Sequence, residues 1–129
     1  MVSIENRLKG CMYGQAVGDA LGLGTEFMLA SDISKFYPNG FNSYSQIIQD
    51  RHRKRFHIGK WTDDTDMMLC ILREVVSNSY IDIYAVARNF KQWADNKPIG
   101  IGRHTYEVLS LFDYLQNPFR ASEIIWELS

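Results

Sequence analysis

The chain has 129 residues, a net charge of −1 at pH 7 and 46% hydrophobic residues. This length allows one modest core, and the near-neutral charge gives no reason to expect nucleic acid or an anionic membrane as a partner. The polar start MVSIENRLKG is not typical of a signal peptide, and no apolar run reaches the ~18 residues of a membrane span. Cys11 and Cys70 lie in apolar helical patterns and indicate no disulfide framework. We therefore expect a single domain, residues 1–129, in the cytoplasm.

The first segment is predicted to be helical from Ser3, a suitable N-cap, because apolar residues follow with helical spacing. They are Ile4, Leu8, Cys11 and Met12. Glycine then recurs every fourth residue, at Gly10, Gly14 and Gly18. Each glycine inside a helix costs about 1 kcal/mol relative to alanine, so these three need a reason. Tight packing against another helix is one explanation, and a functional role is the other.

Residues 22–60 are expected to be mostly irregular, which is often functional when a loop of this length is real. The stretch GFNSYSQII, residues 40–48, could hold a short strand. The basic run RHRKRFHIGK, residues 51–60, is expected to be a solvated face, with a phosphate site as the alternative.

The remainder of the chain is predicted to be helical almost to its end. Apolar positions with helical spacing are Met67, Met68, Ile71, Leu72 and Val75, then Ile83, Ala87, Phe90 and Ala94, then Val108, Leu111, Phe112 and Leu115. Asn117 and Pro118 predict the start of a last helix, with Asn117 as its N-cap. That helix carries Ala121, Ile124, Ile125 and Leu128, and the sequence stops in mid-pattern. Because such a face needs a cover, we expect a dimer, a complementing chain or poor solubility.

An acidic cluster, TDDTD, occupies residues 62–66. Thr62 or Asp63 could cap a helix, and acids in the first turn favour the positive end of its dipole. However, two carboxylates about 4 Å apart repel by about 4 kcal/mol at an effective dielectric near 20. A divalent cation removes that repulsion, and carboxylates with a neighbouring hydroxyl are the oxygen donors that Mg²⁺ or Mn²⁺ prefers. Helix capping and metal binding both remain open from this cluster alone.

A second acidic feature lies upstream, where GQAVGDALGLGTEF places Asp19 and Glu26 on either side of a glycine-rich turn. Glycine allows a backbone to approach a ligand closely. Glu26 is therefore a candidate site residue, although a surface acid in a turn is the alternative.

Together these segments resemble a known family. GCMYGQAVGDALGLGTEFM, followed about forty residues later by WTDDTDMML, is similar to the N-terminal part of the ADP-ribosylglycohydrolases. The later stretch PIGIGRHTYEVLSLFDYLQNP resembles that family's glycine-containing turn and following helix, which contact ADP-ribose. The resemblance covers nearly the whole chain, and family members run to roughly twice this length, with a further aspartate-rich motif that is not present here.

The resemblance implies an all-α fold, of which this chain is the N-terminal half, with a dinuclear Mg²⁺ or Mn²⁺ site. It assigns Thr62, Asp63 and Asp64 to metal binding, and Glu26 and Asp63 to catalysis. It places the turn with Gly100, Gly102, Arg103 and His104 near ADP-ribose. We expect Asp19 and Asp66 to support the site without binding metal.

The implied function is removal of ADP-ribose from modified protein side chains by metal-dependent cleavage of an N- or O-glycosidic bond. Oxocarbenium-like charge builds up in such a cleavage, which needs a well-placed water. Three readings compete. The chain is part of an active hydrolase, or a pseudoenzyme that binds ADP-ribose or nucleotide, or a helical interaction module in which the acids only cap a helix. The implied partner is an ADP-ribosylated protein or ADP-ribose; the metal and the acceptor side chain stay open.

Overall fold

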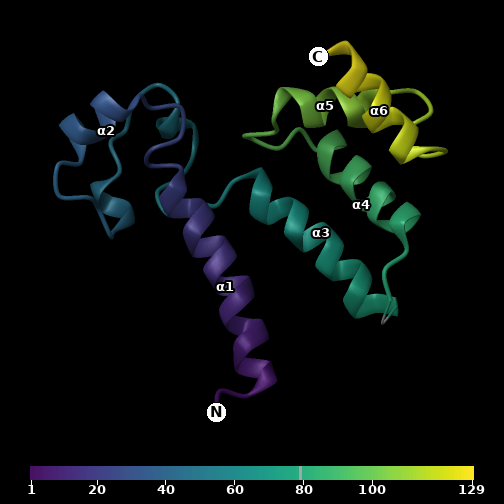
Figure 1. Ribbon diagram of the computed structural model, residues 1–129, viewed down its shortest axis with the longest axis horizontal. Coiled ribbons are helices and arrows are strands. Elements are labelled where there is room, and N and C mark those ends of the chain that lie inside the picture. The colour runs from purple at the N-terminus through teal and green to yellow at the C-terminus, as the bar shows by residue number, and fades with distance from the viewer. Residues whose placement is uncertain (79) are drawn as a thin grey trace. The chain divides into compact units, whose positions relative to one another are not determined.

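The computed structural model describes residues 1–78 and 80–129, and every regular element within them is helical. The elements are α1 (Ile4–Gly22), α2 (Ala30–Phe36), the 3-10 helices η1 (Tyr44–Gln46) and η2 (Arg53–Arg55), α3 (Asp63–Asn78), α4 (Ile83–Asp95), α5 (Arg103–Ser110) and α6 (Pro118–Leu128) (Figure 1). The all-α prediction is confirmed. The strand considered for residues 40–48 is wrong, because η1 lies there. The chain divides into two compact units, residues 1–65 and 66–129.

Helix α1 begins as predicted, with the Ser3 hydroxyl oxygen accepting from the backbone N–H of Asn6 at 3.2 Å. Its glycine face is open: apart from the neighbouring backbone of α1 itself, no heavy atom of the described residues lies within 4 Å of a Cβ added at Gly10, Gly14 or Gly18. Within residues 1–65, no other helix packs against this face, and tight helix packing remains one of the two explanations of these glycines.

The long segment after α1 is organised by its own contacts. The Tyr37 and Phe41 rings lie 4.5 Å apart, and the Tyr37 hydroxyl accepts from the backbone N–H of Ile48 at 3.0 Å. A Cβ at Gly24 would lie 2.5 Å from the Phe41 ring, so only glycine fits there without a shift. Ile47, like Tyr37, is buried. These contacts give residues 23–60 a defined path despite their scarcity of regular structure.

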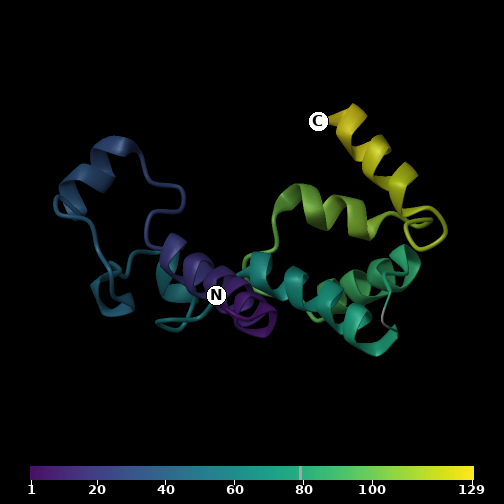
Figure 2. The same ribbon diagram turned by 60° about the horizontal axis from the view of Figure 1, so that its bottom comes forward.

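Residues 66–129 have a hydrophobic core between α4, α5 and α6, which are coloured from green to yellow in Figure 2. Its buried members are Ala87, Val108, Leu109, Tyr114, Ala121 and Ile125. Burial raises the pKa of the Tyr114 hydroxyl to about 12. Helix α6 begins as predicted: Pro118 is its first residue and the Asn117 side chain accepts from the backbone N–H of Arg120 at 3.1 Å.

The third predicted apolar pattern is partly wrong. Helix α5 ends at Ser110, because Leu111 adopts an extended conformation and a series of turns follows. Phe112, expected in the core, is 99% exposed, and Tyr114 is buried in its place. Ile83 and Leu128, at the outer ends of their patterns, are also exposed.

Two further observations concern the cysteines and the possibility of a membrane span. Both cysteines are free, with Cys11 exposed and Cys70 buried. Within the described ranges, no helix is both long enough and apolar enough to cross a membrane.

Candidate functional site

Asp19, in the last turn of α1, joins that helix to the start of α3. The backbone N–H of Thr62 donates to Asp19 Oδ2 at 2.9 Å, and the Thr62 hydroxyl donates to Oδ1 at 2.6 Å. The backbone N–H of Thr65 donates to Oδ2 at 3.1 Å, and its hydroxyl donates to the same oxygen at 2.6 Å. One carboxylate therefore accepts four hydrogen bonds from two threonines.

This arrangement caps α3 from another helix. The first N–H groups of a helix have no partner within the helix and are usually satisfied by a nearby side chain. Here Asp19 accepts the N–H of Thr65, and its negative charge lies at the positive end of the α3 dipole. Burial raises the pKa of Asp19, but the hydrogen bonds from Thr62 and Thr65 outweigh it, so the pKa is lowered from its ordinary value.

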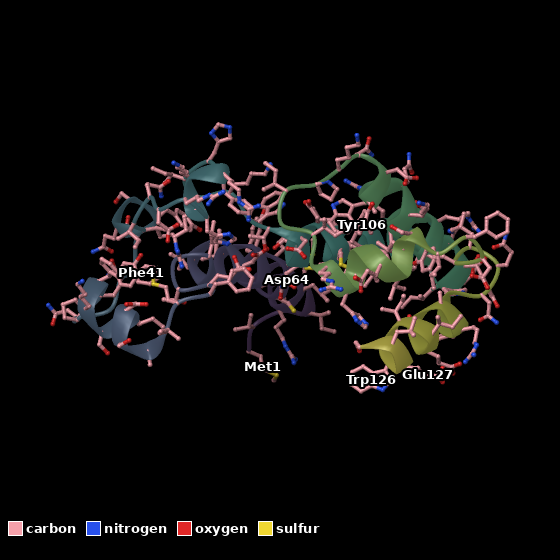
Figure 3. The ribbon with its side chains drawn as sticks, turned by 90° about the horizontal axis from the view of Figure 1, so that it is seen from above. Met1, Phe41, Asp64, Tyr106, Trp126 and Glu127 are labelled. Atoms are coloured by element: carbon pink, nitrogen blue, oxygen red, sulfur yellow. The ribbon has the colours of Figure 1, made fainter. Side chains whose placement is uncertain are left out.

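A pocket of about 440 Å³ lies beside this junction, entirely within residues 1–65. One part of its lining is the open glycine face of α1, and the rest is largely polar. The polar side chains are Gln15, Asp19, Thr25, Glu26, Thr62 and Asp64. Asp64 lies at the start of α3 and is labelled in Figure 3. Asp63, the first residue of α3, is half-buried and is not among the described residues that line the pocket.

Glu26 reaches this pocket from the glycine-rich turn and is paired with a histidine of the basic run. Its Oε2 lies 2.7 Å from His52 Nε2. The next residue, Phe27, has φ of 57°, a left-handed conformation that is unfavourable for a bulky residue. Its ring meets the His52 ring edge-on at 5.1 Å. Glu26 is thus a half-buried, partnered acid rather than an acid on a free surface turn.

Arg53 holds the backbone of the same turn. Its side chain is 3% exposed, Nε donates to the Gly24 carbonyl at 3.1 Å, and Nη2 donates to the Glu26 carbonyl at 2.5 Å. Nη1 donates to Asp50, and so does the backbone N–H of Arg53. The backbone hydrogen bond is the main cause that lowers the pKa of the Asp50 carboxyl, and the charge and side chain of Arg53 add to it. The expectation that residues 51–60 form only a solvated face is therefore wrong for Arg53.

The other predicted site residues belong to the second unit. Asp66 Oδ2 accepts from the indole N–H of Trp93 at 3.0 Å. Gly100 has φ of 100°, and Gly102 directly precedes α5.

Arg103 and His104 begin α5 and are both exposed. Arg103 Nε donates to Glu107 Oε1 at 2.7 Å, and this hydrogen bond raises the pKa of the guanidinium.

The chemistry of the pocket suits a hard cation. Thr62 Oγ1 gives its hydrogen to Asp19, which leaves oxygen lone pairs for another contact, and Asp64 adds a carboxylate. Oxygen donors of this kind are those preferred by Mg²⁺ and Mn²⁺. Among residues 1–78 and 80–129, however, no three His, Cys, Asp or Glu side chains gather closely enough to hold a metal ion. The residues present fit part of a metal site.

The sequence patterns did not indicate Thr65, His52 or Arg53 as residues of the site. Asp50, a residue typical of turn starts, accepts the N–H groups of His52 and Arg53 and so predicts a local turn. This local turn pattern does not indicate that His52 and Arg53 contact Glu26.

Comparison with known proteins identifies the family. The sequence model of the family ADP-ribosylglycohydrolase matches residues 1–124. The ADP-ribosyl-[dinitrogen reductase] glycohydrolase of Rhodospirillum rubrum is 31% identical over 107 residues, which cover 78% of this chain and 32% of that protein. The ADP-ribosylarginine hydrolase Tri1 of Serratia proteamaculans is 30% identical over 88 residues, 68% of this chain and 21% of the relative. The match thus spans about a third or less of each relative's length. The chain belongs to the ADP-ribosylglycohydrolase family.

Proposed function

We propose that this chain provides part of the active site of a hydrolase that removes ADP-ribose from modified protein side chains. The observation that carries the proposal is the pocket lined jointly by Glu26, Thr62 and Asp64 beside the Asp19 junction. The two relatives described above are an ADP-ribosyl-[dinitrogen reductase] glycohydrolase and an ADP-ribosylarginine hydrolase, which supports this substrate class.

In this proposal Thr62, Asp63 and Asp64 hold Mg²⁺ or Mn²⁺. When bound, the metal supplies positive charge that orients ribose hydroxyls and water. The chain's own contribution is to hold the donors in place: the Thr62 hydroxyl donates a hydrogen bond to Asp19, so the lone pairs of Thr62 Oγ1 are left for another contact. Asp66, which accepts from Trp93, is proposed to support the segment that follows.

Glu26 is proposed to accept the proton from the attacking water. Water adds to the anomeric carbon of the ribose, and the bond to the protein side chain breaks with its electron pair going to the side-chain nitrogen or oxygen. The water proton passes to the carboxylate, and an oxygen leaving group takes up a proton from the carboxylate or from solvent. Oε2 is engaged by His52, and no hydrogen-bond partner for Oε1 is found among the described residues. Oε1 is therefore the oxygen proposed to take the proton.

Gly100, Gly102, Arg103 and His104 are proposed to contact ADP-ribose. Gly100 has a backbone conformation that favours glycine, and the start of α5, where Arg103 and His104 are exposed, is the positive end of the helix dipole and favours an anion. The diphosphate is the anionic part of ADP-ribose and is therefore the part proposed to bind at this helix start.

Calorimetric titration of ADP-ribose tests the proposal, with Mg²⁺, with Mn²⁺ and with EDTA. Binding that requires metal is expected, and Asp64→Asn should abolish most of it because the variant loses charge but keeps shape. Asp113→Asn, an exposed acid outside the pocket, is the matched control. Hydrolysis of ADP-ribosyl-arginine and ADP-ribosyl-serine peptides is then measured on the same samples.

The three readings give different results. Metal-dependent turnover supports the proposed hydrolase and identifies the acceptor. Metal-dependent binding without turnover of either peptide indicates a binding pseudoenzyme. Indifference to both metal and ADP-ribose contradicts the proposal and leaves a helical interaction module.

A further inference from the structure

We propose that His52 is a positioning residue for the Glu26 carboxylate, and that Arg55 determines which ring nitrogen of His52 carries the hydrogen. This inference rests on the proposed role of Glu26, but its geometry is independent of it. The two residues come from the basic run of residues 51–60.

The hydrogen-bond chemistry assigns the tautomer. Arg55 Nη2 lies 2.8 Å from His52 Nδ1, and a guanidinium can only donate. Nδ1 must therefore accept, which leaves the hydrogen on Nε2 of the neutral ring. Nε2–H then donates to Glu26 Oε2 at 2.7 Å. Arg55 is itself held in place because its Nε donates to the His52 carbonyl at 3.2 Å.

The imidazole ring is confined on two sides. The rings of Phe27 and Phe56 meet it edge-on, with centroids at 5.1 Å and 5.9 Å. These contacts limit rotation of the imidazole. A donor held in this way restricts the carboxylate it contacts, and a restricted base favours an ordered proton transfer.

Arg53 complements this contact from the neighbouring position. It holds the Glu26 carbonyl, so the backbone and the carboxylate of Glu26 are fixed by two adjacent residues of one segment. The consequence is a carboxylate whose Oε2 is engaged by His52, which leaves Oε1 as the oxygen proposed to take the proton.

Two variants separate positioning from packing. His52→Gln keeps a neutral N–H donor near the place of Nε2 and an oxygen that can accept from Arg55. His52→Leu keeps the bulk but removes both contacts. His57→Gln is the matched control, since His57 is an exposed histidine of the same segment.

Long-range ¹H–¹⁵N spectra of the histidine-labelled chain test the geometry without any substrate. We expect one ring, absent from the spectrum of His52→Gln, to show the Nε2–H tautomer, and Arg55→Leu to allow the other tautomer. An Nδ1–H ring at His52 in the native chain would overturn the proposal.

Turnover of an ADP-ribosylated peptide provides the second readout. His52→Leu should lower kcat by roughly ten- to hundredfold, the factor that corresponds to a hydrogen bond to a charged group, with little change in KM. His52→Gln should recover most of this loss, and His57→Gln should match the native chain. Equal kcat in the native chain and His52→Leu would overturn the positioning role. If the native chain has no turnover, the proposed function fails, while the nitrogen spectra still decide the assignment at His52.

Discussion

Replacement of Asp19 by asparagine should destabilise the fold of residues 1–65 by about 2–4 kcal/mol. The carboxylate accepts four hydrogen bonds from Thr62 and Thr65. Bonds to a charged acceptor contribute about 1.5–3 kcal/mol each and bonds to a neutral one about 0.5–1.5, so each retained bond weakens by about 1 kcal/mol. The amide also turns one acceptor into a donor that faces a hydroxyl group, and the cap of α3 loses its charge.

Urea unfolding at pH 7, followed by far-UV circular dichroism, measures this loss, with Asp113→Asn as the control. A double-mutant cycle with Thr65→Val should show coupling, because the Thr65 hydroxyl and Asp19 Oδ2 are 2.6 Å apart. A loss below about 0.5 kcal/mol, or additive effects of the two substitutions, would refute the reasoning.

The same carboxylate makes a pH prediction with a definite sign. The folded pKa of Asp19 is lowered from 3.8, so its contribution to stability is present above pH 3.8 and is lost as the pH falls through the lower, folded value. Acid unfolding of Asp19→Asn should therefore show a shallower loss of stability below pH 3.8 than unfolding of the native chain. Parallel curves would contradict this assignment.

Three further predictions concern packing and association. Gly24→Ala should cost about 1–3 kcal/mol in unfolding free energy, because its Cβ would overlap the Phe41 ring, whereas Gly22→Ala, with open space around it, should be tolerated. Arg53→Met should cost about 2–4 kcal/mol, since two backbone carbonyls lose their donor; urea unfolding checks both, and a cost below about 0.5 kcal/mol would speak against them. Light scattering should show a dimer or larger species that diminishes in Trp126→Ser, because Trp126 is 76% exposed and projects from α6 (Figure 3), while a native monomer at high concentration would exclude this.

Much of the architecture could be predicted from local patterns. Ser3 before a helical apolar spacing and Asn117 before Pro118 each marked a helix start that the structure confirms. Such signals depend on contacts between residues three or four positions apart, which the sequence displays directly. The two motifs around Glu26 and residues 61–69 similarly identified the family.

The local pattern failed at the end of α5. The spacing of Val108 and Phe112 predicts that the helix continues past Ser110. In the structure the chain turns after Ser110, and Tyr114 is buried where Phe112 was expected. Tyr114 belongs to the core shared by α4, α5 and α6, so tertiary packing overrides the local helical spacing at this point.

The sequence by itself therefore determined the helical class, most helix starts, the family and the acidic candidates. Only the tertiary structure decided that Asp19 caps α3 through Thr65, 46 residues later in the chain, and that Glu26 contacts His52 across 26 residues. Neither pairing leaves a periodic trace, because each depends on the path of an irregular segment. That path is set by scattered contacts such as Phe41 against Gly24, which become visible only once the chain has folded.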